Sequence, residues 1–156
     1  MPIILGLDIG DARIGVAISD ELGIAAHPVC TLTRKNRKAD VAALQSLATT
    51  HNVEQIVIGL PKMLNGEVGV QGQKVQKFAN ALKREVNLPI CFWDERLTTV
   101  EAGRILRDTN RRGKKRKQVI DQVAAVLILE GYLEGLRNSD REMESEIFRR
   151  IEPVEI

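Results

Sequence analysis

This chain of 156 residues contains very few aromatic side chains. The whole set is one tryptophan, one tyrosine and three phenylalanines, or 3% of the sequence. Proteins that bind single-stranded nucleic acid without sequence preference stack the bases on aromatic side chains. The scarcity of such side chains argues against a binding module of that kind, and it requires a core built from aliphatic residues.

Cysteines and long hydrophobic runs are scarce as well. Cys30 and Cys91 are far apart and show no metal-ligand spacing, so we interpret them as small buried apolar residues in a reducing compartment. No segment approaches the roughly 20 apolar residues of a transmembrane helix. The N-terminus also has no basic segment followed by a long apolar one. We therefore expect a cytoplasmic protein that does not contact a membrane.

The charge is small overall but unevenly distributed. The net charge is +2, yet residues 104–117 contain eight basic side chains and one acid, for a local net charge of +7. A smaller basic group, Arg34, Lys35, Arg37 and Lys38, lies near the first expected helix. A charge run is usually a solvated surface, but it is also the electrostatic signature of a protein that binds phosphates.

Length and hydrophobic periodicity predict a single α/β domain. We expect a mixed five-stranded sheet in which three antiparallel strands are followed by βα units, with helices on both faces. Pro28 lacks a backbone N–H, so its strand is expected at an edge of the sheet. The expected strands are residues 2–7, 13–19, 23–33, 53–60 and 88–93, and the expected helices are residues 38–51, 69–86, 99–108 and 118–136.

The last part of the chain differs from the rest in composition. Residues 138–156 contain six acids and three bases, with a few apolar residues at helical spacing. We assign residues 1–137 to the folded domain and residues 138–156 to a charged C-terminal tail. The sequence leaves open whether this tail is docked or mobile.

Three carboxylates occupy positions that are unfavourable for a charged group. Asp8 follows the apolar run "IILGL", Glu95 follows the last expected strand, and Asp121 interrupts the apolar final helix. Buried carboxylates are destabilising unless they are paired or bind a metal ion. Ala124 and Ala125, one turn after Asp121, would let that helix approach the sheet closely. We therefore expect the three acids to converge at one edge of the sheet.

Such a cluster beside a basic segment indicates metal-assisted hydrolysis of phosphodiester bonds. Carboxylate oxygens bind Mg²⁺ or Mn²⁺, and two such ions can activate a water molecule and stabilise the leaving oxygen. We predict Asp8, Glu95 and Asp121 as both catalytic residues and metal ligands. Residues 111–117 immediately precede the helix of Asp121, so they would lie over the metal site and bind phosphates.

Each acid also has a structural interpretation that the sequence leaves open. Asp8 could shape the turn that follows it. Asp121 could face solvent in the first turn of its helix, where a negative charge interacts favourably with the helix dipole. Glu95 and Asp94 could pair with Arg96 or cap the next helix. Asp94 is also the alternative ligand to Glu95. The distance between the strands of Asp8 and Glu95 is a difficulty for a shared metal site. Glu95 would start roughly 9 to 10 Å from the first strand, two inter-strand spacings away.

Four segments of the chain resemble, in the same order, the motifs of the YqgF/RuvX family. They are "LGLDIGDARIGVAISD", "GLPKMLNGEVGVQGQKVQKFA", "DERLTTVEA" and "IDQVAAVLILEGYL", and the resemblance covers residues 3–136. It implies an RNase H-like fold and activity as a Holliday junction resolvase or as a nuclease maturing the 5′ end of pre-16S ribosomal RNA. The family's acids fall on Asp8, Glu95 and Asp121, and its motif arginine on Arg96.

We therefore predict a metal-dependent nuclease, with pre-16S ribosomal RNA as the preferred substrate and branched DNA as the alternative. The further alternative is a non-catalytic RNA-binding protein of ribosome assembly. The expected partners are nucleic acid and the ribosome, and the expected state is a monomer or weak homodimer. The predicted substrate-binding residues are all basic: Arg13, Arg96, Arg111, Arg112, Lys114, Lys115, Arg116 and Lys117.

A rival class follows from the segment "LDIGDARIGVA", which also resembles the first phosphate loop of the actin and sugar-kinase superfamily. Those proteins place two such subdomains around ATP. This chain is long enough for one, and a second Asp-Gly hairpin is not found in it. We therefore disfavour ATP binding.

Overall fold

The computed structural model describes the backbone of residues 1–97 and 114–151 and the side chains of residues 1–97 and 119–143. Its sheet has the strand order β3-β2-β1-β4-β5, with an antiparallel meander followed by two strands parallel to the first. The predicted sheet is confirmed. The strands are β1 (Ile4–Ile9), β2 (Arg13–Ser19), β3 (Ala26–Thr33), β4 (Gln55–Leu60) and β5 (Ile90–Asp94).

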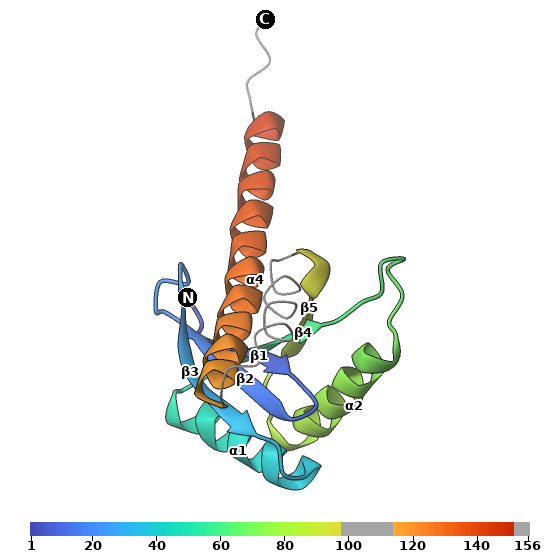
Figure 1. The fold of residues 1–156 in the computed structure, drawn as a ribbon. Helices are drawn as coiled ribbons and strands as arrows, with labels where there is room; N and C mark the ends of the chain where they lie inside the picture. Colours follow the sequence, from blue (N-terminus) through green and yellow to red (C-terminus); the bar gives the residue numbers. More distant parts are fainter. Residues whose placement is uncertain (98–113, 152–156) are drawn as a thin grey trace, which may run out of the picture.

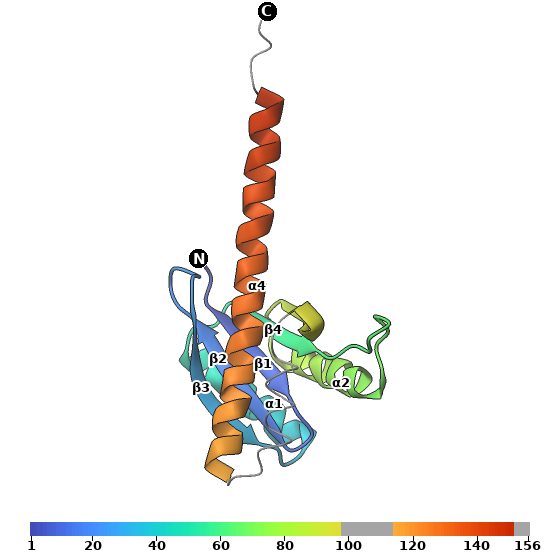
Figure 2. The ribbon, with the colours of Figure 1, turned by 45° about the horizontal axis from the view of Figure 1, so that its top comes forward.

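Helices cover both faces of this sheet, as predicted (Figure 1). Figure 2 shows α4 crossing one face while the two shorter helices lie on the other. Asn36 caps the first helix, because its side chain accepts a hydrogen bond from the backbone N–H of Ala39 at 2.8 Å. The helices are α1 (Arg37–Thr50), α2 (Val70–Glu85) and α4 (Lys114–Ile151), and the short 3-10 helix η1 (Glu95–Leu97) follows β5. The expected helix at residues 99–108 lies outside the described residues.

The two faces of β1 carry different side chains. Successive residues of a strand point to opposite faces. Leu5, Leu7 and Ile9 belong to the core beneath α1 and α2, so Gly6 and Asp8 point toward α4. The most buried strand of the molecule therefore presents its one carboxylate to the helix that carries Asp121.

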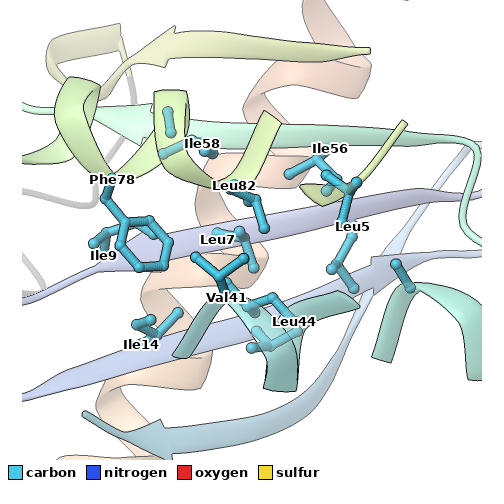
Figure 3. Packing of buried hydrophobic residues seen from close by; sticks show 14 of the residues in the cluster. Leu5, Leu7, Ile9, Ile14, Val41, Leu44, Ile56, Ile58, Phe78 and Leu82 are labelled. Carbon is cyan, nitrogen blue, oxygen red and sulfur yellow. The ribbon is translucent and has the colours of Figure 1, made fainter. Parts of the chain in front are cut away.

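The core beneath α1 and α2 is built from large side chains, shown in Figure 3. Leucine and isoleucine side chains from three strands pack against Val41 and Leu44 of α1 and against Phe78 and Leu82 of α2. All four of these helix residues are at most 4% exposed. Phe78 is the only aromatic side chain in this cluster of described residues, which agrees with the expected aliphatic core.

The face beneath α4 includes several small residues beside larger ones such as Ile4 and Val57. A Cβ atom placed on Gly6 would lie 2.8 Å from the Cβ of Leu129 in α4. One placed on Gly15 would collide with the backbone carbonyl of Asp121. Ala124 and Ala125 are buried at the same interface. The helix backbone therefore lies close to the sheet, as the alanines predicted, and the glycines of the sheet also make this approach possible.

The helix α4 is longer than predicted at both ends. It begins at Lys114 rather than 118 and continues to Ile151 rather than 136. Arg137 still contacts the domain, since its Nη1 donates to the carbonyl of Ile24 at 3.2 Å, but residues 138–143 are exposed. Beyond them the helix projects away from the sheet (Figure 1). No helix within the described residues combines the length and hydropathy needed to cross a membrane.

Two further predictions concern the edges of the sheet. Pro28 lies on the edge strand β3, next to an irregularity in its pairing with β2, so the edge position is confirmed. Cys30 and Cys91 are free thiols that are only partly buried and pack against the margins of the two cores. Desolvation nevertheless raises the pKa of the Cys30 thiol.

Candidate active site

Asp8 lies near the end of β1 between two glycines. Its partner in the antiparallel ladder is Gly15 of β2. On the other side Leu7 pairs with Ile58 of β4, which places Gly59 beside Asp8. The Asp8 carboxylate is buried, with 1% of the residue exposed. Because neither neighbour has a side chain, the sheet itself leaves room on both sides of the carboxylate.

Glu95 reaches this room from the far side of β4. It is the first residue of η1, directly after β5, and is 4% exposed. A Cβ atom on Gly59 would lie 2.7 Å from the Glu95 Oε1. The carboxylate of Glu95 therefore lies over β4, the strand that separates β5 from β1. The gap of two inter-strand spacings that the sequence suggested is crossed because position 59 is a glycine.

Asp121 approaches Asp8 from the opposite side, over β2. Its backbone carbonyl packs directly against Gly15, the residue paired with Asp8. Asp121 is 2% exposed, so all three predicted acids are buried. Acids from β1, η1 and α4 are thus gathered around one strand end, with Asp8 in the middle. The structural interpretation in which Asp121 faces solvent is wrong.

Arg13 forms an ion pair with one of these acids. Its Nε donates to the Asp121 Oδ2 at 2.6 Å, and the Asp121 side chain is 3% exposed against 26% for Arg13. In this arrangement no group of three His, Cys, Asp or Glu side chains could hold a metal ion within the described part of the chain. The acids are gathered but do not form a closed cage of three ligands.

Asp94 belongs to the other face of the sheet. It pairs with Leu60, whose side chain lies in the core beneath α1 and α2. The Arg96 Nη2 donates to the Asp94 Oδ2 at 2.7 Å, and the Lys62 Nζ lies 3.8 Å from the same oxygen. Hydrogen bonds from Arg96 lower the pKa of Asp94, and the same bonds raise the pKa of Arg96. This geometry favours Glu95 over Asp94 as the acid that accompanies Asp8.

The structure describes only some of the basic residues that were predicted to bind the substrate. The backbone of residues 114–117 forms the first turn of α4, one turn before Asp121, where a loop was expected. Arg111 and Arg112 lie outside the described residues. Lysine and arginine at the N-terminus of a helix oppose its dipole, whereas a phosphate there is favoured. Arg96 is engaged with Asp94, so its contact with substrate would have to compete with that ion pair.

The family resemblance places Gly59 in a loop bordering the active site, but sequence reasoning did not predict that Gly15 and Gly59 let the acids approach one another. Gly15 and Gly59 stand in two different strands, each at a position that faces α4. The signal in the sequence is a glycine inside an otherwise bulky apolar run, in "RIGVAIS" and in "QIVIGL". A glycine inside a strand often marks a place where another backbone or a ligand approaches closely.

Comparison with known proteins finds similar chains over most of this sequence. A family model described as "RuvX: Holliday junction resolvase" matches residues 2–135. A protein named "Putative pre-16S rRNA nuclease" from Moorella thermoacetica is 51% identical over 133 residues, which are 85% of this chain and 95% of the relative. A protein of the same name from Clostridium acetobutylicum is 47% identical over 133 residues, covering 85% of this chain and 98% of the relative.

Solved structures of resolvases have a similar fold. RuvC of T. thermophilus, in complex with a Holliday junction substrate, superimposes with a TM-score of 0.54 and 12% identity, over 86% of this chain and 96% of RuvC. The fowlpox virus resolvase bound to Holliday junction DNA gives a TM-score of 0.50 and 14% identity, over 86% and 98% of the two chains. At these identities the similarity concerns the fold, and it confirms the predicted RNase H-like class.

Proposed function

This chain belongs to the RuvX family, and on that premise we propose that it is a metal-dependent nuclease that processes the 5′ end of pre-16S ribosomal RNA. The observation that carries the proposal is the burial of three carboxylates, from β1, η1 and α4, around one strand end. The names of the relatives support the choice of RNA. We place the activity in the cytoplasm.

The acids fit a hard divalent cation such as Mg²⁺ or Mn²⁺. Their donor atoms are carboxylate oxygens, which these ions prefer. Mg²⁺ is usually bound through one or two carboxylates together with water and substrate phosphates, so a cage of three protein ligands is not required. Asp8 and Glu95 would hold the ion, and Asp121 would join them when Arg13 releases it. A bound ion supplies a Lewis acid and a water molecule of lowered pKa.

The other residues of the site bind and orient. Arg13 neutralises the buried Asp121 carboxylate while that carboxylate is not needed for a cation. Released from Asp121, the partly exposed guanidinium would be available to a phosphate, which it can bind through two hydrogen bonds. Gly15 and Gly59 let Asp121 and Glu95 approach Asp8 closely, because a side chain at either position would collide with them. The basic residues 111–117 would attract the nucleic acid to this end of α4.

Branched DNA is the second candidate substrate. It is favoured by the family description and by the structural similarity to two resolvases bound to junction DNA. Symmetric cleavage of a four-way junction needs two active sites and hence a dimer. Processing of one RNA strand needs only one active site. A monomer or weak homodimer that associates with the ribosome is therefore the state we propose for the RNA-processing protein.

The test compares a pre-16S fragment with a four-way DNA junction, each incubated with Mg²⁺, Mn²⁺ or Ca²⁺. We expect site-specific cleavage of the RNA with Mg²⁺ or Mn²⁺. Asp8→Asn should abolish cleavage and retain RNA binding, because it removes one negative charge near the phosphate. Asp140→Asn is the matched control, since Asp140 is exposed on the projecting part of α4. Failure of the unmodified protein to cut either substrate with any ion would instead support the non-catalytic RNA-binding role, and cleavage by Asp8→Asn would show that Asp8 is not catalytic.

A further inference from the structure

A basic cavity of about 330 Å³ opens on the other face of the strand end that carries Asp8. It lies between the β1–β2 turn, the start of α1 and the first half of α2. Its charged lining consists of four cations and one acid: Arg34, Arg37, Lys74, Lys77 and Asp11. Two of the cations come from the small basic group noted in the sequence, which the carboxylate site does not use.

One wall of the cavity is fixed by Arg34. Its Nε donates to the Oδ2 of the buried Asp40 at 3.1 Å, and its Nη1 donates to the carbonyl of Gly10 at 3.0 Å. Its guanidinium also lies 4.9 Å from the centre of the Phe78 ring. These contacts hold Arg34 in place and balance its charge, so we regard it as part of the structure of the cavity.

The remaining cations are not balanced in this way. Among the described side chains, those of residues 1–97 and 119–143, no ion pair involves Arg37 or Lys77, and both residues are exposed. Lys74 has only a long contact, 3.7 Å from its Nζ to the Asp11 Oδ1. Cations from two helices therefore face one cavity with a single exposed acid between them. A concave surface lined by one sign of charge concentrates ligands of the opposite sign.

We propose that this cavity binds the phosphate backbone of the nucleic-acid substrate, a few nucleotides away from the bond that is cleaved. The inference rests on the proposed nuclease function. Ile9, which lines the cavity, directly follows Asp8 in β1, and the two side chains point to opposite faces. The cavity and the acids thus open at the same end of one strand, separated by the thickness of the sheet.

A strand that lies at Asp8 can continue around the end of the sheet into the cavity. The basic start of α4 would then hold the substrate on one face, and Arg37, Lys74 and Lys77 would hold it on the other. Arg37 and the lysines bind phosphates without reading bases. The cavity therefore contributes affinity and orientation, while the choice of the cleaved bond is left to the carboxylate side.

The test is the double variant Arg37→Gln/Lys77→Gln, with Lys83→Gln/Arg84→Gln as its matched control. The control removes one lysine and one arginine from the last turn of α2, outside the cavity. Binding of a labelled pre-16S fragment is measured by fluorescence anisotropy in EDTA at several salt concentrations. We expect the cavity variant to bind on the order of tenfold more weakly, with a salt slope smaller by about 1.4 to 1.8, because each phosphate contact adds about 0.7 to 0.9.

Cleavage kinetics and thermal melting complete the test. The cavity variant should show a raised KM with unchanged kcat, and both double variants should melt at the temperature of the unmodified protein. Equal weakening by the control, or an unchanged salt slope in the cavity variant, would overturn the proposal. Binding of pyrophosphate to the unmodified protein and to the cavity variant is measured as well. If the cavity variant loses pyrophosphate binding but keeps RNA binding, the proposal is also overturned, because the cavity would then bind a small anion.

Failure of the nuclease function gives a different result. If the unmodified protein binds RNA and cuts nothing, the loss of affinity in the cavity variant still identifies a nucleic-acid contact. If the unmodified protein cuts RNA and the cavity variant binds it equally well, only the cavity proposal fails.

Discussion

Gly15 and Gly59 determine how closely the proposed catalytic acids approach one another. At position 59 an added methyl group would meet the ends of two side chains, the Ile128 Cδ1 and the Glu95 Oε1. At position 15 it would meet the backbone of α4 at Asp121. A side chain can rotate away from a methyl group, whereas a helix backbone has to move as a whole. The two glycines are therefore not equivalent.

Gly59→Ala and Gly15→Ala should differ in stability for this reason. We expect Gly59→Ala to lower the free energy of unfolding by about 1–3 kcal/mol, the usual result of overpacking a core, and Gly15→Ala to lower it further. Gly59→Ala should also weaken cleavage at low Mg²⁺, because it displaces the Glu95 carboxylate. Urea unfolding followed by circular dichroism measures the first effect. Equal losses for the two variants would contradict this account of the α4 contact.

The ion pair between Arg13 and Asp121 leads to a second prediction. Arg13→Gln removes the charged partner of a buried carboxylate, and a hydrogen bond to a charged group contributes about 1.5–3 kcal/mol. We expect a lower melting temperature in EDTA and a larger recovery with Mg²⁺ than the unmodified protein shows, because a cation can replace the guanidinium. Arg96→Gln is the control, since Asp94 lies on the other face. If Mg²⁺ raises the melting temperature of Arg13→Gln no more than that of Arg96→Gln, a cation does not bind at Asp121.

The positions of the acids were predictable, but their contacts were not. A charged residue after an apolar run marks a strand end, and the carboxyl ends of parallel strands in one sheet lie at the same edge. That reasoning places Asp8 and Glu95 near each other. Glu95 crosses over Gly59, and Asp121 forms an ion pair with Arg13. Both contacts depend on which residues face each other across strands and helices. Local sequence patterns do not reveal this.

At the scale of elements, strand and helix periodicity predicted the sheet well and α4 only in part. The docked segment around Ala124 to Leu133 has the apolar pattern of a buried helix. Residues 114–117 lack this pattern and residues 138–151 show it only weakly, so periodicity ended the predicted helix too early at both ends. Glutamate, arginine and methionine are nevertheless good helix formers, and extending an existing helix is much easier than starting one.

The projecting part of α4 should be dispensable for folding. Residues 138–143 are exposed, and Arg137 makes the last contact with the domain among the described side chains. We therefore propose residues 1–137 as the folding unit. A chain that ends after Ser139 should keep its melting temperature within a few degrees, because the lost segment buries little surface. A chain that ends after Tyr132 should unfold, because it lacks the buried Leu133 and the contact of Arg137.

At the scale of the whole molecule, the two faces of the sheet have different roles. Large aliphatic side chains and two helices on one face build a core that holds the sheet rigid. Small residues on the other face admit one helix at close range, and with it the acid Asp121. A buried carboxylate cluster is unfavourable in the metal-free protein, so the stability of the fold should depend on the ion that the cluster is proposed to bind.

This dependence gives the last prediction. A ligand that binds only the folded protein stabilises it by about 2.7 kcal/mol when its concentration is 100 times its dissociation constant. We expect the melting temperature of the unmodified protein to rise with Mg²⁺ or Mn²⁺, and that of Asp8→Asn to stay constant, because the central carboxylate of the cluster is lost. Asp140→Asn should follow the unmodified protein. If the ion raises the melting temperature of Asp8→Asn as much as that of the unmodified protein, the cation binds elsewhere.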